Sequence, residues 1–201
     1  MTQARPVAND VSPIFTARWS PRAFTGEAID EARLNTFFEA ARWAPSAFNA
    51  QPWRFIYARR NDEHWAGFLS LLNDFNRSWA QHAAALVLVV SATRFTPPGK
   101  SEAIQTGSHA FDTGAAAAYL ALQASLAGWH AHTMGGFDKA RARSELGVPE
   151  GFEVEAVIAI GKLGDPQSLP PGLRERETPS PRQPLSAIVA EGRFNFPGTP
   201  A

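Results

Sequence analysis

Two arginines and a serine hydroxyl lie within five residues in the segment Arg18-Trp19-Ser20-Pro21-Arg22. Guanidinium and hydroxyl groups in such a cluster can donate several hydrogen bonds to one phosphate, and the bonds from arginine are charge-assisted. Arginine is also common on protein surfaces, where water satisfies it. The segment by itself therefore indicates either a small anion site or a solvated charged surface.

A second segment, residues 44–53, has the sequence APSAFNAQPW and combines two stiffening prolines with polar side chains. Ser46, Asn49 and Gln51 could hydrogen-bond the edge of a polar heterocycle, whose carbonyl groups and ring nitrogens need fixed partners. The same residue types also cap turns through bonds to nearby backbone groups. Chemistry alone leaves both interpretations open for this loop.

A third segment, residues 133–137, contains the consecutive glycines Gly135 and Gly136, directly before a helix predicted at 138–146. Because glycine lacks a Cβ atom, such a pair lets the backbone approach a flat ligand closely and present its N–H groups. A plain turn before the helix is at least equally consistent with the pattern.

Several common chemistries are absent from the sequence. The chain has no cysteine, which excludes disulfides, thiolate nucleophiles and iron–sulfur clusters, so redox chemistry would need an organic cofactor or a histidine/carboxylate metal site. Neither Gly-x-Gly-x-x-Gly nor a phosphate-binding P-loop occurs. Ser108, His109 and Asp112 lack the Gly-x-Ser-x-Gly context of a hydrolase and are typical of a helix N-terminus. His130 and His132 would share one strand face, but lack a third ligand, so no metal site is predicted.

The charge balance narrows the possible partners. Lysine plus arginine and aspartate plus glutamate number 19 each, so no whole-chain field favours nucleic acid or an anionic membrane. A local basic pocket for one phosphate remains compatible with this balance. No apolar run approaches the roughly 20 residues needed to cross a bilayer, and the start lacks the apolar core of a signal peptide. We therefore expect a soluble cytoplasmic protein.

Hydrophobic spacing predicts a helix-rich α+β domain over residues 1–201, with a central, mostly antiparallel sheet flanked by helices. A doubly wound fold is the alternative, but its Gly-rich turn is missing. On the predicted helix at 109–128, one side carries Phe111, Ala115, Ala118, Leu122 and Leu126. The other expected elements are helices beginning at Ser12-Pro13 and spanning 30–44, 61–72 and 76–83, strands at 53–58, 86–90 and 154–160, and a loop at 95–107.

The C-terminal residues 165–201 differ from the rest, because they hold eight of the 16 prolines. A structureless stretch of this length is unusual inside a compact domain. It is expected to be either disordered or an arm that lies on another surface. Phe194 and Phe196 favour the arm, since solvated tails seldom carry such apolar anchors.

Taken together, the order and spacing of these segments resemble the nitroreductase family of FMN-dependent NAD(P)H oxidoreductases. The family's Arg-x-Ser-x-Arg stretch matches residues 18–22. Its Ala-Arg-x-Ala-Pro-Ser and Asn-x-Gln-Pro-Trp motifs match residues 41–46 and 49–53, which is the most specific part of the resemblance. The helix at 112–128, the Gly135-Gly136 turn and an Arg-x-Pro-Leu stretch at 182–185 also fit, so the resemblance spans about residues 14–190.

The resemblance implies an intertwined homodimer that binds FMN at its interface. Arg18, Ser20 and Arg182 would hold the phosphate of FMN, with Trp19 adjacent. Arg22 would lie near the pyrimidine edge of the flavin, where a cation stabilises the reduced form. The other implied cofactor contacts are Pro45, Ser46 and Asn49 from the partner subunit, Met134, Gly135 and Gly136 near the flavin N5 edge, and Asn76 on the ring.

Two positions depart from the family pattern. Trp79 stands where many members have a lysine, and Ser180 stands where many have a basic residue two positions before the final arginine. These changes predict a weaker grip on the phosphate and a more apolar environment for the flavin ring.

The activity implied by the resemblance is ping-pong hydride transfer from NADH or NADPH through flavin N5 to a nitroaromatic, a quinone or a similar acceptor. No protein nucleophile is expected, and Arg22 is the supporting residue. The same fold also supports flavin-based dehydrogenation, reductive dehalogenation and flavin breakdown. A non-catalytic FMN-binding protein and a flavin-free dimeric interaction protein are the alternatives outside enzymology.

Overall fold

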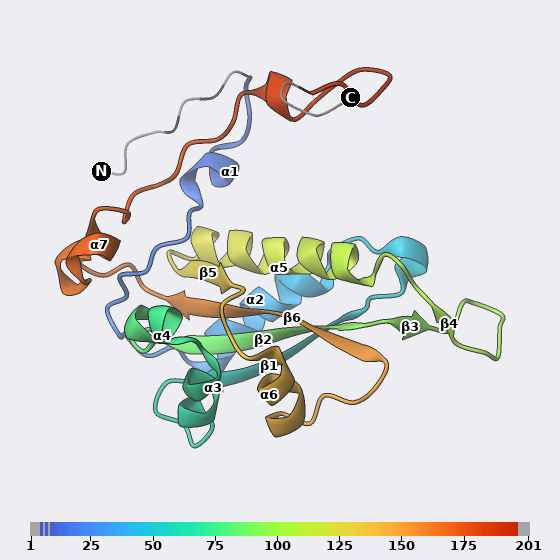
Figure 1. Ribbon diagram of the computed structural model, residues 1–201, viewed down its shortest axis with the longest axis horizontal. Helices are drawn as coiled ribbons and strands as arrows, with labels where there is room; N and C mark the ends of the chain where they lie inside the picture. The colour runs from blue at the N-terminus through green and yellow to red at the C-terminus, as the bar shows by residue number, and fades with distance from the viewer. Residues whose placement is uncertain (1–4, 6, 8, 197–201) are drawn as a thin grey trace.

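The computed structural model describes residues 5, 7 and 9–196, and its centre is a four-stranded sheet. The strands are β1 (Trp53–Arg59), β2 (Ala85–Ala92), β5 (His130–Met134) and β6 (Phe152–Gly161). They are arranged in the order β1-β2-β6-β5, and every neighbouring pair is antiparallel (Figure 1). This arrangement confirms the predicted α+β class with an antiparallel sheet and excludes the doubly wound alternative, whose sheet is mainly parallel.

The strand β2 shows why the sheet lies between two helical layers. Leu86, Leu88 and Val90 belong to one hydrophobic cluster, whereas Val87 and Val89 belong to another. Side chains alternate between the two faces of a strand, so both faces of β2 are buried. Burial of each of these side chains contributes roughly 1.5–3 kcal/mol.

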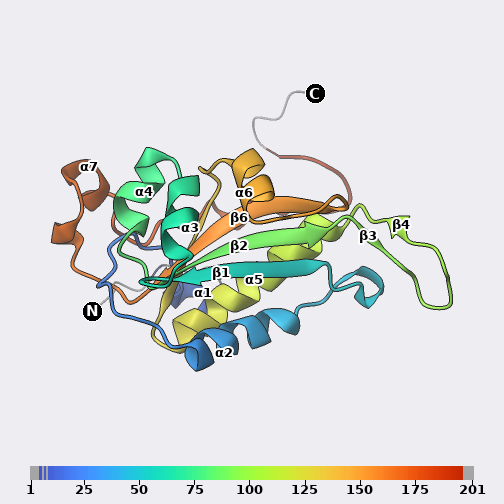
Figure 2. The ribbon, with the colours of Figure 1, turned by 90° about the horizontal axis from the view of Figure 1, so that it is seen from below.

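Helices cover the two faces of the sheet (Figure 2). On one face lie α2 (Glu31–Arg42) and α5 (His109–Leu126). On the other face lie α3 (Trp65–Leu71), α4 (Asp74–Ala80) and α6 (Lys139–Glu145). None of the helices among the described residues is long and apolar enough to span a membrane.

The helix α5 is apolar around much of its circumference, and the chain covers only one side of it. Thr113, Leu120 and Ala124 are buried against the sheet and α2. The side predicted from the sequence is the opposite one, since Leu126 is exposed and Phe111 is 84% exposed. An apolar helix face left uncovered in this way is typical of a contact with another protein surface.

Several boundaries differ from the expected ones. The predicted helix at 61–72 begins only at Trp65, because residues 60–64 form turns. The predicted loop at 95–107 contains a short hairpin of β3 (Arg94–Phe95) and β4 (Ile104–Gln105). The predicted helix start at Ser12-Pro13 is confirmed as α1 (Pro13–Ala17).

The expectation of a structureless C-terminal stretch is wrong in part. Asp165 caps a 3-10 turn, η2 (Pro166–Ser168), and α7 (Pro171–Arg174) buries Leu173 in the core. A third 3-10 turn, η3 (Leu185–Ala187), follows after a linking segment. Prolines at the first turn of a helix cost no hydrogen bond, so the proline-rich sequence is compatible with these short elements. Residues 197–201 of the predicted arm lie outside the described residues.

Candidate functional site

A small polar pocket of about 170 Å³ collects the arginines that the sequence analysis singled out. Arg18, Trp19, Ser20 and Arg22 line it from the segment that follows α1, and Arg182 lines it from the C-terminal segment that follows α7. Within the segment, Arg18 Nη1 donates to Ser20 Oγ at 3.3 Å. The fold therefore brings together five predicted site residues that come from opposite ends of the chain.

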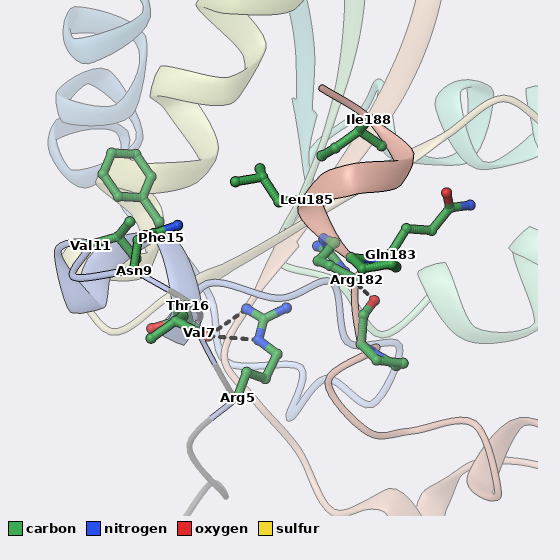
Figure 3. A pocket seen from close by; sticks show the side chains of 12 residues that line it. Arg5, Val7, Asn9, Val11, Phe15, Thr16, Arg182, Gln183, Leu185 and Ile188 are labelled. Atoms are coloured by element: carbon green, nitrogen blue, oxygen red, sulfur yellow. Dashed lines mark hydrogen bonds between the residues drawn. The ribbon is translucent and has the colours of Figure 1, made fainter. Parts of the chain in front are cut away.

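The same pocket also contains Arg5, Arg176 and Thr178, which sequence reasoning missed, and His132, which it considered only for a metal site. Ser180, named above as a departure from the family pattern, lines the pocket as well. Arg5 is the best fixed of these, because its Nε and Nη2 donate to Thr16 O at 2.7 and 2.5 Å (Figure 3). Its Nη2 also donates to Arg18 O at 2.5 Å. No local motif marks Arg5, so only the fold reveals that it lies where the N-terminal segment meets the segment that follows α7.

The positive charges of the clustered arginines repel one another, and a bound anion would offset this repulsion. Burial, followed by repulsion from Arg5 and Arg182, lowers the pKa of Arg18. Burial and repulsion from Arg182 likewise lower the pKa of Arg5. Among residues 5, 7 and 9–196, none of these three guanidinium groups forms an ion pair with a carboxylate. A phosphate in the pocket would relieve this repulsion, so the donor set fits the phosphate of a nucleotide cofactor.

Arg22 differs from the other arginines because it has an acidic neighbour. The buried Glu177 accepts hydrogen bonds through Oε1 from the backbone N of Arg22 at 2.6 Å and of Ala23 at 2.8 Å. Its Oε2 lies 4.0 Å from Arg22 Nη1. Burial and repulsion from Arg176 lower the pKa of Arg22, while Glu177 raises it. Glu177 therefore ties the arginine segment to the segment that follows α7 and holds Arg22 in place.

His132 borders the pocket as a neutral imidazole. Burial is the main cause that lowers the pKa of His132 to about 4. Its Nδ1 lies 2.9 Å from Pro21 O, and a carbonyl can only accept, so this nitrogen carries the proton. The ring centroid lies 4.6 Å from that of Trp79, which is fully buried and whose indole nitrogen has no hydrogen-bond partner among the described residues. Trp79 is thus part of the core, behind His132.

The two glycines of the Gly135-Gly136 turn differ in their surroundings, since Gly136 is closely packed and Gly135 is open. The carbonyl of Gly136 accepts from Asn76 Nδ2 at 3.0 Å and from Asn73 N at 3.1 Å. A Cβ atom on Gly136 would lie 2.5 Å from Asn73 Nδ2 and 2.7 Å from Asn76 Nδ2, so this glycine is needed for packing against α4. Gly135 faces open space, where its backbone is accessible. Met134 is buried in the core.

The loop that contains Pro45, Ser46 and Asn49 has a tightly turned backbone. It forms a 3-10 turn, η1 (Ala47–Asn49), and the φ angles of Phe48, Asn49 and Gln51 are 53°, 53° and 48°. Left-handed conformations cost free energy in residues other than glycine, so the surroundings must enforce them. Ser46 Oγ accepts from Gln51 N at 3.0 Å, which shows that this hydroxyl serves the turn itself.

The loop and the backbone segment that carries Arg18 and Arg22 lie toward opposite ends of α5 (Figure 1). Ala47 N donates to Asp112 Oδ2 at 3.1 Å, in the first turn of the helix. Trp19 instead packs edge-on against His130, just after the helix ends, with ring centroids 6.2 Å apart. An α-helix of 18 residues is about 27 Å long. Within one chain, therefore, the loop residues do not meet the arginine pocket.

The other chemical patterns do not form catalytic arrangements. Ser108 Oγ donates to Asp112 Oδ2 at 2.9 Å, whereas His109 Nδ1 lies 2.7 Å from Ser91 Oγ, so serine, histidine and aspartate are not linked in series. In the described part of the chain, no three histidine, aspartate or glutamate side chains are grouped so that they could hold a metal ion.

Comparison with known proteins assigns the family. The model named "Nitroreductase family" matches residues 15–76 and 66–162, which include the Arg18–Arg22 segment, the loop and the glycine turn. The chain belongs to the nitroreductase family. The resemblance inferred from the motifs is thereby confirmed.

Individual relatives of this nitroreductase-family chain agree with the assignment. A crystal structure of an oxidoreductase containing FMN matches with a TM-score of 0.93 and 46% identity, covering 98% of this chain and 100% of that one. An uncharacterized 15.4 kDa protein of Mycolicibacterium smegmatis is 36% identical over 154 residues, covering 72% of this chain and 99% of its own length. An NADH dehydrogenase of Thermus thermophilus is 27% identical over 206 residues, covering 90% of this chain and 95% of its own length.

Proposed function

We propose that this chain is an FMN-dependent oxidoreductase that uses NADH or NADPH to reduce a small acceptor such as a nitroaromatic or a quinone. The observation that carries the proposal is the arginine pocket, whose volume suits one phosphate and in which Arg5, Arg18 and Arg182 form no ion pair with any described carboxylate. When bound, FMN would supply the redox chemistry by accepting hydride from the nicotinamide and passing two electrons to the acceptor. The FMN-containing relative and the NADH dehydrogenase support this proposal.

The chain's own residues would bind and orient the cofactor. Arg18, Ser20 and Arg182 would donate to the phosphate, and Trp19 would pack beside it. Arg5 adds a further positive charge, which compensates for the missing basic residue at Ser180. The weaker phosphate grip expected from the sequence is thus offset by a residue from the other end of the chain.

The residues near the flavin ring would act mainly through position and charge. Arg22 would hold a positive charge near the pyrimidine edge, with Glu177 fixing its place. Such a charge favours electron uptake by the bound ring. Gly135 would offer an accessible backbone near the N5 edge, while Gly136 and Asn76 hold the turn against α4.

A homodimer would complete the site, because the Pro45–Asn49 loop cannot reach the pocket of its own chain. An apolar groove of about 710 Å³ runs between Phe15 of α1 and the uncovered side of α5, including Tyr119 and Leu122. A second apolar cavity of about 590 Å³ lies between the N-terminal segment and the arm, lined by Phe15, Leu185 and Ile188 (Figure 3). A second copy of the chain would cover these surfaces, and its loop would contact the cofactor from the other side.

The test is to purify the protein and identify its chromophore. We expect a yellow protein that releases FMN on denaturation and bleaches under anaerobic conditions when NADH or NADPH is added. Reoxidation by a panel of nitroaromatics and quinones would then define the acceptor. FAD in place of FMN, or no flavin even after reconstitution, would contradict the proposal. Bound FMN that neither nicotinamide reduces would instead indicate storage or another flavin reaction.

A further inference from the structure

A second polar pocket, of about 460 Å³, lies at the end of the sheet away from the arginine pocket. It forms where η1 and the start of β1 meet the β3–β4 hairpin, which extends beyond the end of β2 (Figure 2). Phe48, Asn49, Arg54, Arg94 and Phe95 are among the residues that line it. No residue of this pocket apart from Asn49 belongs to the predicted cofactor contacts.

Two aromatic rings form one wall of this pocket. Phe48 and Phe95 are stacked, with centroids 5.9 Å apart and an interplanar angle of 22°. Phe48 is nevertheless 76% exposed, and its backbone has a positive φ. The stack on Phe95 therefore leaves an aromatic surface uncovered, and such a surface can stack against a planar ligand.

Two arginines supply all the charge of the lining. Arg54 Nη1 donates to Gln51 O at 3.1 Å and to Trp53 O at 2.7 Å, so backbone carbonyls hold its guanidinium. Arg94 Nη2 donates to Ala103 O at 2.7 Å across the hairpin. Within the described residues, neither arginine forms an ion pair, and no acidic residue lines the pocket. Each guanidinium retains further N–H donors for a ligand.

We propose that this pocket binds the acceptor, and that the acceptor is a planar aromatic carboxylate. The ring would stack on Phe48, and the carboxylate would pair with Arg94, assisted by Arg54. The inference rests on the proposed function, because Asn49 joins this pocket to the loop that would serve the partner's cofactor. It goes further by assigning a substrate class and the two residues that select it.

A binding experiment without turnover tests the charge preference. Benzoate and benzamide have nearly the same shape, but only benzoate is charged. Calorimetry on the flavin-loaded protein should show tighter binding of benzoate, and Arg94→Ala should lower the benzoate affinity by about tenfold or more, as expected for one charge-assisted bond. Arg94→Lys should retain most of the preference, because it keeps the charge. Arg33→Ala, on the exposed surface of α2, is the matched control and should bind both ligands as the wild type does.

Turnover gives a second readout with 4-nitrobenzoate and 4-nitrobenzamide as acceptors. Reduction of either nitro group to the nitroso group consumes one NAD(P)H and one proton and yields NAD(P)+ and water. Arg94→Ala should lower kcat/KM for the carboxylate about tenfold more than for the amide. Phe95→Leu should weaken both acceptors by a similar factor, because the ring does not sense charge.

The outcomes separate this inference from the proposed function. If the enzyme reduces neutral acceptors but wild type and Arg94→Ala show the same benzoate preference, the function stands and the substrate assignment falls. If the protein holds no flavin yet binds benzoate through Arg94, the function falls and the pocket assignment stands. A loss in Arg94→Ala that is confined to kcat/KM for NADPH would place the reductant in this pocket and overturn the proposal.

Discussion

The arginine pocket and the Pro45–Asn49 loop are built in opposite ways. The pocket gathers charged side chains from the N-terminal and C-terminal segments and the neutral His132 from β5, so its geometry depends on the whole fold. The loop is instead shaped by interactions within a few residues of sequence. These are its prolines, the hydrogen bond from Gln51 N to Ser46 Oγ, and several left-handed backbone angles. We therefore expect substitutions that remove charge to affect the arginine pocket most, and substitutions that change backbone conformation to affect the loop most. The proposed dimer would place the two against the same cofactor.

Removing charge from the pocket should have the largest effect. Arg18→Ala should weaken FMN binding by roughly 1.5–3 kcal/mol, about 10- to 150-fold, because a charge-assisted bond is lost. Arg182→Ala should act similarly, and the double variant should lose less than the sum if both groups hold one phosphate. Fluorescence titration with FMN and with riboflavin, which lacks the phosphate, measures this. Equal losses for both flavins would show that the arginines do not hold the phosphate.

The glycine turn allows a matched pair of variants. Gly136→Ala would push Asn73 and Asn76 away from the turn, and with them the cap of α4 and the bond to the Gly136 carbonyl. We expect a loss of about 1–2 kcal/mol in the free energy of unfolding, measured by urea denaturation. Gly135→Ala meets no atom within 4 Å and should leave stability nearly unchanged. Two variants of equal stability would contradict this packing account.

Variants at Arg5 test whether its positive charge compensates for the basic residue that is missing at Ser180. Because its guanidinium already donates to backbone carbonyls, Arg5→Ala should cost only about 0.5–1.5 kcal/mol of FMN affinity. Adding Ser180→Lys to this variant should recover part of the loss, since the lysine would restore a positive charge beside Arg182. An additional loss on introducing the lysine would refute the compensation.

The smallest effect is expected for backbone strain in the loop. At Phe48, with φ at 53°, glycine is less strained than any other residue. We therefore expect Phe48→Gly to be more stable than Phe48→Ala by about 1 kcal/mol, a reversal of the usual order of these residues. Thermal unfolding of the two variants is sufficient for the comparison. Greater stability of the alanine variant would mean that the loop relaxes out of the left-handed region.

Local patterns in the sequence predicted the parts of the fold that depend on local forces. The run from Leu86 to Val90 is apolar on both faces and forms the central buried strand. Asp30 precedes a periodic helix and caps it through Arg33 N. The short hairpin at 94–105 could not be predicted in the same way, because its two-residue strands carry no periodicity.

The site residues likewise separate into those that local motifs predicted and those that only the fold reveals. Arg18, Ser20 and Arg182 could be predicted from motifs, and the structure places them around one pocket. Arg5 and Glu177 could not, since each reaches the site only through contacts more than ten residues away in sequence. The apolar face of α5 was visible in the sequence, but hydrophobic periodicity does not tell whether the same chain or a second one covers it.

In the proposed dimer each active site uses the arginine pocket of one chain and the loop of the other, and complementation tests this sharing most directly. At an FMN concentration that just saturates the wild type, Arg18→Ala and Asn49→Ala should each have little activity alone, because each damages every site through one of its two components. When equal amounts are unfolded and refolded together, half of the dimers should be mixed, and each mixed dimer should contain one intact site. Activity should then recover to about a quarter of the wild-type level. No recovery in a mixture shown to contain mixed dimers would contradict the account, since both components would then lie within one chain.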